Sequence, residues 1–463
     1  MSGPGPAGAE RARLASPDAE RWRDWGPFLA ERSWGTVRED YSADGEAWGS
    51  FPHDHARSRA YRWTEDGLAG VCDRRQGLCL ALALWNGTDP ILKERLFGLT
   101  GKQGNHGEDV KECYWYLDAV PSHAWLRWRY HYPQGPFPYQ QLVDENARRG
   151  YDQPEYELID TGAFDGGRFF AVEVEYAKAS PEDLCMRVTA RNHGPVAAPV
   201  HLLPHLWFRN VWSWGRHDTH PELRVTADGS ALELEHPDLG RWRTAAADAA
   251  GAAAGRWLTC ENETNVGRLY GEDAAARSPL TCAYPKDGIG DHVISGAATV
   301  DPDGTGTKAA CWFRFDVDPG ATVEVRLRLQ RVDADTPAAP DLGRAFDEVH
   351  AVRRQEADEL HASLVAPDLT EDEALVMRQA FAGLIWSQQF YRFDVARWLD
   401  GDPGEPAPPP ERHQGRNASW RHVDANEVIL MPDTWEYPWF ASWDLAFHCV
   451  AMAHLDATVA KRQ

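Results

Sequence analysis

The stretch V-E-V-R-L-R-L-Q, residues 323–330, alternates apolar side chains with charged or polar ones. Residues 170–176 repeat this alternation. A period of two places every second side chain on the same face, so both stretches are predicted to be half-buried strands. Further strands are expected at 78–86, 125–132, 184–192, 200–208, 232–235 and 311–317. Many short strands separated by Gly, Pro, Asn and Asp are typical of a β-sandwich, which we expect to span residues 31–332.

The periodicity changes after residues 333–340, D-A-D-T-P-A-A-P, which we interpret as a linker because this composition cannot pack a layer. From 346 to 364, apolar residues recur at helical spacing. Thr370 and Glu373 then match the capping box of a second helix. The apolar face of that helix is expected to hold Met377, Phe381, Leu384 and Ile385. The predicted domains are a flexible segment 1–30, a sandwich 31–332, a linker 333–340 and a helical domain 341–463.

The composition excludes several classes of partner. The chain of 463 residues has 48 Lys and Arg against 71 Asp and Glu, a formal charge of -23 that repels nucleic acids and anionic lipids. Residues 1–20 lack the apolar core of a secretory signal, and the longest apolar stretch, 79–85, is far shorter than the roughly 20 residues that span a bilayer. Eight scattered cysteines without a C-x-x-C pair indicate reduced thiols. We expect a cytoplasmic protein with no nucleic-acid or membrane partner.

The segment with the most potential chemistry is P-D-T-W-E-Y-P-W-F-A-S-W-D-L-A-F-H, residues 432–448. The chain has 21 tryptophans, and their flat apolar faces suit the C–H faces of sugar rings. Aromatic surroundings disfavour a charged carboxylate and raise its pKa, which a catalytic acid near neutral pH requires. Asp444, between Trp443 and Phe447, is therefore the candidate acid. The alternative is an acid at the start of a helix, stabilised there by the helix dipole.

Two other clusters give weaker signals. His53-Asp54-His55 contains metal-ligand types, but in a strand the two histidines would share a face that Asp54 avoids, and no third ligand has suitable spacing. The loop 101–112 either reaches over a substrate cleft or forms a solvated turn, and the solvated turn is favoured. Its potentially reactive side chains are His106, Glu108 and Asp109. Because nucleotide-binding and nucleophile-elbow motifs are also absent from the sequence, we predict no metal and no cofactor.

The segment W-D-L-A-F-H at 443–448, approached through W-E-Y-P-W-F, resembles the catalytic-acid segment of glycoside hydrolase family 63. This family includes the processing α-glucosidase I of the mannosyl-oligosaccharide pathway and bacterial mannosylglycerate and glucosylglycerate hydrolases. Three upstream blocks are similar to large bacterial members and occur in the right order. They are E-R-S-W-G-T-V-R-E-D-Y-S at 31–42, F-P-H-D-H-A-R-S-R-A-Y-R-W at 51–63 and G-N-H-G-E-D-V-K-E at 104–112. The resemblance covers nearly all of the chain from residue 31.

The resemblance implies both a fold and a mechanism. The fold is an N-terminal β-sandwich packed on an (α/α)6 barrel, and the reaction is inverting hydrolysis of α-glucosides or α-mannosides of oligosaccharides or glycosylglycerates. Asp444 matches the general acid, and a distant glutamate is the general base, with the two carboxyls about 6.5–9.5 Å apart. By the same resemblance, the carbohydrate substrate contacts Trp435, Glu436, Tyr437, Trp439 and Trp443.

The chain departs from the family in its helical part. A barrel of six helical hairpins needs far more helices than residues 341–463 can supply, so we expect only the first helices of an incomplete (α/α)6 barrel. Such a barrel would expose apolar side chains, among them Met377, Phe381, Leu384, Ile385, Phe440 and Phe447.

The family's catalytic base lies beyond Gln463, so this chain alone is expected to be inactive. A C-terminal half supplied by another chain would then be its partner. The alternative is a noncatalytic carbohydrate-binding or assembly fragment of a split enzyme. A third interpretation is another six-hairpin glycosidase activity, of the trehalase or glucoamylase type. The sequence does not distinguish the sugar, the linkage or the aglycone.

Overall fold

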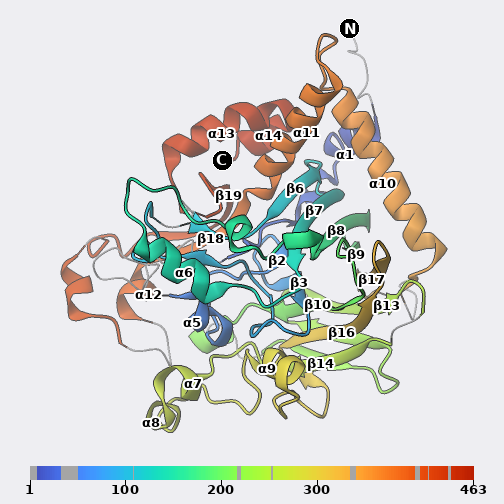
Figure 1. The fold of residues 1–463 in the computed structure, drawn as a ribbon. Helices are drawn as coiled ribbons and strands as arrows, with labels where there is room; N and C mark the ends of the chain where they lie inside the picture. Colours follow the sequence, from blue (N-terminus) through green and yellow to red (C-terminus); the bar gives the residue numbers. More distant parts are fainter. Residues whose placement is uncertain are drawn as a thin grey trace.

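A computed structural model describes residues 8–32, 51–107, 109–215, 220–251, 254–333, 340–401, 407–415, 417–435 and 439–463. Within these residues, two large antiparallel sheets pack face to face (Figure 1). The smaller sheet has, in spatial order, β1 (Trp25–Gly26), β2 (Leu68–Asp73), β3 (Leu78–Trp85), β10 (Ala198–Phe208), β16 (Lys308–Val317) and β14 (Arg256–Cys260). The larger sheet has β15 (Thr305–Gly306), β11 (Glu222–Val225), β12 (Ala231–His236), β13 (Gly240–Asp248), β17 (Thr322–Arg331), β9 (Asp183–Asn192), β8 (Phe169–Ser180), β7 (Trp125–Pro133) and β6 (Tyr114–Ala119).

The alternation that predicted the strands also positions the core between the sheets. Val325 and Leu327 on β17 have no exposed surface and belong to the largest apolar cluster. Their cross-strand partners on β9 are Val188 and Met186, so neighbouring strands present apolar side chains at the same level. Each stretch predicted as a strand coincides with an observed strand.

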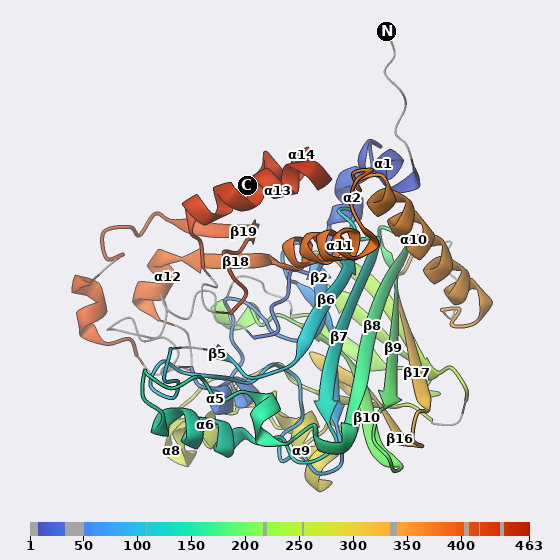
Figure 2. The same cartoon turned by 45° about the horizontal axis from the view of Figure 1, so that its top comes forward.

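Short elements inserted between the strands of the sheets were not predicted from the sequence. They are α5 (His53–Ser58), β4 (Gly98–Leu99), β5 (Asp109–Val110), α6 (Tyr139–Arg148), α7 (Val266–Tyr270), α8 (Glu272–Ala275) and α9 (Gly288–Ser295), with 3-10 turns at Leu158–Thr161, Asp165–Gly167 and Trp212–Trp214. Elements this short carry too few residues for a clear period. Figure 2 shows α5, β5 and α6 together on one side of the sheets, and the candidate site lies in this region, between α5, β4 and α6.

The N-terminal residues form α1 (Ala9–Leu14) and α2 (Ala19–Arg23) and contact the rest of the protein. The buried carboxylate of Glu10 accepts hydrogen bonds from the backbone N–H of Ser122 at 2.9 Å and from its hydroxyl at 2.8 Å. Arg13 forms an ion pair of 2.5 Å with Glu356 of α10 (Arg344–Ala362). Residues 8–32 are therefore tied to both the sheet region and the first C-terminal helix.

The region after residue 340 does not form the start of an (α/α)6 barrel, so the predicted fold class is wrong. α10 lies on the outer face of the larger sheet, where Phe346 and Leu360 pack with Trp125 and Cys185. α11 (Glu371–Trp386) begins at the predicted capping box. The chain then continues into β18 (Gln388–Asp394), which pairs with β19 (Asp424–Leu430) in a separate two-stranded sheet.

The physical reason for this difference is the surface against which each helix packs. In an α/α barrel, successive helices bury their apolar faces against one another, whereas α10 and α11 bury theirs against the sheets. Ala382, Ile385 and Trp386 of α11 belong to the same cluster as the strands. The remaining elements are α12 (Val395–Asp400), a 3-10 turn at Pro410–Gln414, α13 (Ser442–Leu455) and α14 (Ala457–Ala460).

All eight cysteines are free thiols. Burial raises the pKa of Cys185 and that of Cys260 to about 12, so both are protonated and unreactive near neutral pH. Among the helices that the structure describes, none combines the length and the apolarity needed to cross a membrane.

Candidate functional site

A cleft of about 240 Å³ lies where α5, β4 and α6 meet. Its wall combines aromatic rings with an imidazole, a carboxylate, a hydroxyl and amide groups. The lining residues are Pro52, His53, Asp54, Ile91, Phe97, Gly98, Thr100, Gln103, Tyr139, Gln140 and Val143. Ring faces combined with a few hydrogen-bonding groups are the usual surroundings of a small polar organic ligand, and sugars require both.

Aromatic side chains form one wall of the cleft. The ring centroids of Phe97 and Tyr139 are 5.0 Å apart in an edge-to-face contact, and the His53 ring is 5.4 Å from Phe97 and 5.8 Å from Tyr139. Burial lowers the pKa of His53 well below its ordinary value, and the cations of Arg32 and Lys93 act in the same direction. His53 is therefore neutral near pH 7 and offers one hydrogen-bond donor and one acceptor.

A buried ion pair packs beside the aromatic residues of this wall. Lys93 Nζ is 2.6 Å from Glu112 Oε1 and 3.8 Å from the ring centroid of Phe137, and neither charged side chain is exposed. The Tyr130 hydroxyl donates to Glu112 Oε2 at 2.6 Å, and the backbone N–H of Phe97 donates to Glu112 Oε1 at 2.9 Å. Glu112 thus fixes the position of Phe97, and removing one partner of the pair would leave a buried charge uncompensated.

Trp435 connects the cleft with the aromatic segment identified in the sequence. Its side chain is buried and lies against Gly98, a residue of the cleft wall. A Cβ atom added at Gly98 would be 1.7 Å from Trp435 Cζ2, so only glycine leaves room for the indole. Trp439 is half-buried and packs on a second aromatic cluster that includes Trp63 and Trp214. Glu436 and Tyr437, the other two members of this segment, lie outside the described residues.

Asp444 lies in the first turn of α13 and is half-buried. The two aromatic side chains expected to enclose it face solvent instead. Trp443 is 73% exposed and Phe447 is 70% exposed, with ring centroids 6.5 Å apart. The first turn of a helix is also where the helix dipole stabilises a carboxylate. The position therefore suits an acid that the helix dipole stabilises. It also suits a catalytic acid, but Trp443 and Phe447 do not form the apolar surroundings that such an acid needs.

Glu31 is a buried carboxyl group that the sequence did not single out as a site residue. It accepts a hydrogen bond from the Tyr116 hydroxyl at 2.9 Å, and burial raises its pKa to about 7. Tyr116 in turn stacks on Trp386 of α11, with ring centroids 5.4 Å apart. Raised carboxyl pKa values are common at catalytic sites, but Glu31 is only 4% exposed and so lies out of reach of a substrate. We assign Glu31 a structural role where the sheet meets α11.

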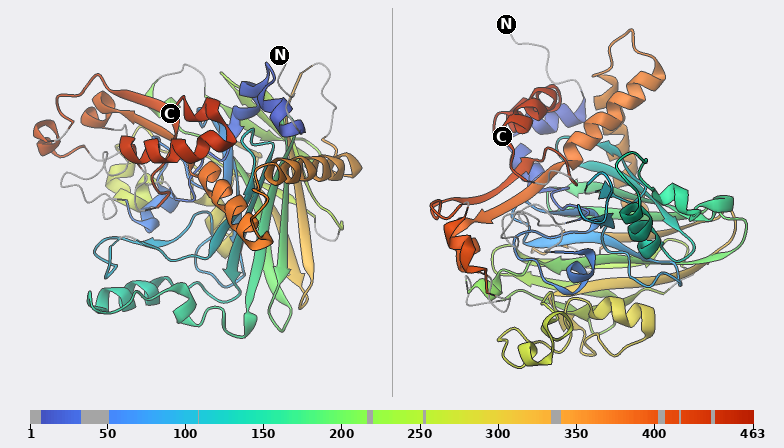
Figure 3. Two further views of the ribbon diagram at one scale, coloured as in Figure 1. Left: turned by 90° about the horizontal axis from the view of Figure 1, so that it is seen from above. Right: turned by 60° about the vertical axis from the view of Figure 1, so that its left-hand side comes forward.

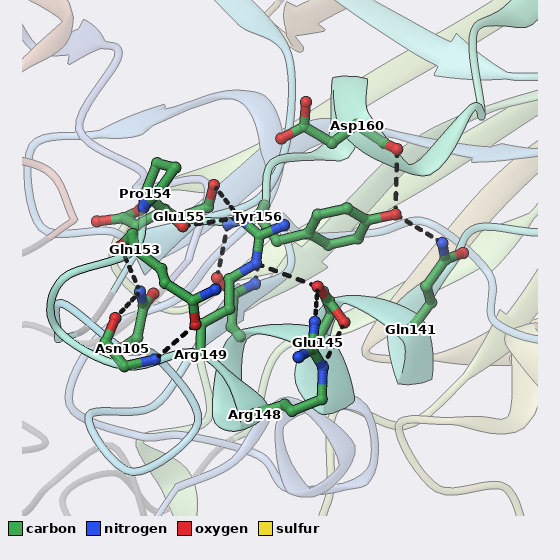
Figure 4. Close-up of polar contacts among 12 residues, drawn as sticks. Asn105, Gln141, Glu145, Arg148, Arg149, Gln153, Pro154, Glu155, Tyr156 and Asp160 are labelled. Atoms are coloured by element: carbon green, nitrogen blue, oxygen red, sulfur yellow. Dashed lines mark hydrogen bonds and ion pairs between the residues drawn. The ribbon is translucent and has the colours of Figure 1, made fainter.

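The loop 101–112 contributes to the wall of the cleft through Gln103. Figure 4 shows how the same loop is fastened to residues 149–157. Asn105 Nδ2 donates to the carbonyl oxygens of Gly150 at 3.1 Å and Gln153 at 3.0 Å, and His106 Nε2 is 2.8 Å from the latter oxygen. The start of this loop therefore borders the cleft through Gln103, and residues 101–107 form turns and bends.

Three carboxylates near this loop have oxygens within 4.8 Å of one another: Asp109, Glu155 and Glu157. Lys111 Nζ lies among them, 3.0 Å from Glu155 and 3.0 Å from Glu157, and also bonds to Asp109. Its ammonium group therefore takes the place in which a metal ion would be held. His53 lies on the short helix α5 rather than on a strand, and it belongs to no such group among the described residues.

No family model matches the chain. The chain is 38% identical to "Uncharacterized protein YMR196W" of Saccharomyces cerevisiae over an alignment that is 492 positions long, gaps included. The alignment covers 98% of this chain and 45% of the yeast protein, so the chain spans less than half the length of this relative.

Partial similarity to solved structures includes carbohydrate-active enzymes. A family GH92 inverting mannosidase of Bacteroides thetaiotaomicron matches with a TM-score of 0.24 and 7% identity, over 82% of this chain and 41% of that one. A family GH92 α-mannosidase of the same organism matches with a TM-score of 0.22 and 14% identity, over 49% and 28%. A putative kojibiose phosphorylase from the human microbiome matches with a TM-score of 0.24 and 7% identity, over 74% and 38%. TM-scores of this size do not establish a shared fold.

Proposed function

We propose that this chain is part of a glycoside hydrolase that acts on α-glucosides or α-mannosides of oligosaccharides or glycosylglycerates, with inversion at the anomeric carbon. The observation that carries the proposal is the contact of Trp435 with Gly98, which joins the aromatic segment to a cleft with aromatic and hydrogen-bonding walls. A sugar ring has flat C–H faces edged by hydroxyls, and the cleft offers groups for both. The ordered blocks that resemble glycoside hydrolase family 63 support the same proposal.

In the proposed reaction, Asp444 acts in its protonated form. It gives its proton to the glycosidic oxygen as the bond between that oxygen and the anomeric carbon breaks. A water molecule attacks the anomeric carbon from the opposite face, and a general base takes the proton of this water. The base is expected from a glutamate outside this chain. Asp444 is half-buried in the first turn of α13.

Substitutions of two neighbouring glutamines test whether the cleft binds a sugar. Gln140 lines it, whereas Gln141 is exposed and donates to the Tyr156 hydroxyl at 2.7 Å, outside the cleft (Figure 4). Calorimetric titration with maltotriose and with an α-linked mannobiose is expected to detect binding of one of these sugars. Gln140→Ala should weaken that binding about 5-fold, the loss of one net hydrogen bond of about 1 kcal/mol. Gln141→Ala should leave it unchanged. Equal weakening by both substitutions, or no binding of either sugar, contradicts the assignment of the cleft.

The role of Asp444 is tested in a chimera in which this chain replaces the aligned region of the yeast relative. Asp444→Asn is expected to lower kcat at least about 100-fold, because the leaving oxygen loses its proton donor. Glu427→Gln, which changes an exposed carboxylate on β19, is the matched control and should keep wild-type turnover. If Asp444→Asn turns over like the wild type, Asp444 is not the acid.

A noncatalytic carbohydrate-binding or assembly fragment is the second candidate function, and the exposed apolar side of α13 favours it. Assaying the purified chain alone and the chimera separates the two. Hydrolysis by the chain alone excludes the fragment hypothesis. Hydrolysis by the chimera only supports a split catalytic site, whereas sugar binding without hydrolysis by either protein supports the noncatalytic function.

A further inference from the structure

α13 is apolar on both of its sides, although it lies at the periphery of the molecule (Figure 3). Its inner side buries Met452 and Leu455 in the largest apolar cluster, and Leu445 is also buried. Its outer side leaves Trp443 and Phe447 more than two-thirds exposed, and Val450 is 68% exposed. A surface helix normally carries polar residues on its outer side, and a helix that is apolar all round is typical of a buried position.

The exposed residues form a continuous line along the helix. Positions 443, 447 and 450 follow the spacing i, i+4 and i+7, which places their side chains on one face. Phe440, just before the helix, is 51% exposed. We refer to Phe440, Trp443, Phe447 and Val450 as the outer stripe. The stripe offers a partner large aromatic side chains of the type that dominates the centre of protein interfaces.

The charge of α13 restricts the kind of partner that fits. Asp444 is the only Asp, Glu, Lys or Arg residue in the helix, which also contains His448 and His454, so electrostatic attraction cannot provide most of the recognition. An apolar stripe without charge is complementary to the apolar face of another helix. A second copy of this chain is disfavoured, because each copy carries a formal charge of -23 and the two would repel. The same charge opposes contact with an anionic membrane surface.

The length of the yeast relative provides a source for such a partner. The aligned region accounts for 45% of that protein, so more than half of it lies outside the region that this chain matches. That remainder is long enough to contain a helix that covers α13.

We infer that the outer stripe is the docking surface for an apolar helix face in the part of the longer protein that lies outside this chain. This inference rests on the proposed function, in which the general base comes from outside this chain. Trp443 of the stripe and Asp444 are adjacent in the first turn of α13. A segment that docks on the stripe is thereby brought beside the proposed acid, where a base supplied by that segment is needed.

Oxidative footprinting of two proteins tests the inference: this chain and the full-length yeast relative. In this chain, Trp443 and Phe447 are expected to react with hydroxyl radicals at the rate of solvent-exposed side chains. In the yeast protein, the residues aligned with the outer stripe should be apolar and should react at least about 10-fold more slowly, because a docked helix excludes solvent. Polar residues at these positions, or labelling as fast as in this chain, would overturn the inference.

Self-association is examined with the same chain. Light scattering at micromolar concentration should show a monomer that binds a hydrophobic dye, and Phe447→Glu should remove at least about half of the dye signal. Val352→Glu, at an exposed position of α10, is the matched control and should keep the signal. A dimer that Phe447→Glu dissociates would assign the stripe to a second copy and overturn the inference. A monomer that binds no dye would also overturn it.

Hydrolysis by the yeast protein is measured separately, so that the two proposals fail independently. Protection of the stripe without hydrolysis of any α-glucoside or α-mannoside would refute the proposed function and leave the docking surface standing. Hydrolysis without protection would refute only the docking surface.

Discussion

α10 and α13 are both helices of the C-terminal region, but their outer sides differ. α10 buries Phe346 and Leu360 against the larger sheet and exposes charged residues, among them the ion pair of Arg344 with Glu348 at 2.6 Å. α13 also buries an inner side, yet it exposes Trp443 and Phe447 to solvent. Both helices form within this chain. The composition of the outer side, rather than helix formation itself, indicates whether a helix has all of its partners in the chain.

The largest expected effect on the free energy of unfolding is at the side of α10 that packs on the larger sheet. Phe346 has no exposed surface, and the guanidinium groups of Arg187 and Arg326 lie 5.5 and 5.2 Å from its ring centroid. Phe346→Ala is expected to lower the free energy of unfolding by about 3–5 kcal/mol in urea denaturation. Val352→Ala, at a half-exposed position of the same helix, should change it by less than about 0.5 kcal/mol. Similar losses for both variants would mean that α10 is not anchored through this face.

A smaller effect on stability is expected at Asp118, which contacts both α10 and α11 from the larger sheet. Asp118 of β6 is 3.2 Å from His361 Nε2 of α10 and accepts a hydrogen bond from Arg378 Nε of α11 at 3.0 Å. Burial alone would raise the pKa of Asp118, but the hydrogen bonds from His361 and Arg378 hold it at about 2, below its ordinary value of 3.8. Because the pKa is lower in the folded state, this carboxylate stabilises the fold above about pH 4, and its contribution is lost as the pH falls toward 2.

The expected contribution of Asp118 is about 2 kcal/mol. Urea unfolding at pH 7 and at pH 3 should show about half of this loss for the wild type, because pH 3 lies between the pKa of about 2 in the folded state and the ordinary value of 3.8. Asp118→Asn should be less stable at pH 7 and should lose less between the two pH values. Asp358→Asn, which removes an exposed partner of Arg378, serves as the control. If Asp118→Asn loses as much stability as the wild type between pH 7 and pH 3, another carboxylate carries the effect.

The N-terminal cap of α11 is expected to contribute less to stability than Asp118 does. The Thr370 hydroxyl accepts from the backbone N–H of Glu373 at 3.3 Å, and the Glu373 carboxylate accepts from the backbone N–H of Thr370 at 2.8 Å. Thr370→Ala is expected to cost about 1 kcal/mol, measured by thermal unfolding. Thr458→Ala, at an exposed position of α14, is the control and should have no measurable effect. An unchanged midpoint for Thr370→Ala would show that tertiary packing alone defines the start of α11.

The smallest effect on stability is expected at the outer side of α13. Phe447→Ala should change the free energy of unfolding by less than about 0.5 kcal/mol, because the ring contacts mostly solvent. The contrast with Phe346→Ala measures the difference between the two helices directly. A loss of more than about 2 kcal/mol for Phe447→Ala would show that the ring is packed within this chain after all.

The sequence predicted the elements of this fold better than their arrangement. Alternation located the main strands, because a half-buried strand needs a period of two, and Thr370 with Glu373 located the start of α11. The barrel was predicted wrongly because an apolar helix face does not specify its partner, and α10 packs on a sheet. Residues 388–394 form a strand that is buried on both sides, so they show no alternation that would have indicated it.

The candidate site was predicted only in part. Trp435 belongs to the segment that the sequence singled out, but its contact with Gly98 joins residues far apart in the chain and could not be inferred from spacing. The raised pKa of Glu31 arises from burial, which a sequence pattern does not reveal. The exposure of Trp443 and Phe447 likewise depends on which other segments pack on α13, and a sequence pattern does not reveal this. Because both rings face solvent, they do not enclose Asp444 as expected.

The most direct test of the proposed function is proton NMR of the sugar first released by the chimera from an α-linked glucoside or mannoside. Inversion predicts that the β-anomer appears first and then mutarotates, and that Asp444→Asn releases no sugar on the same timescale. Initial release of the α-anomer would contradict an inverting mechanism. Release by Asp444→Asn at the wild-type rate, or no hydrolysis of either substrate class, would contradict the assignment of this chain to such an enzyme.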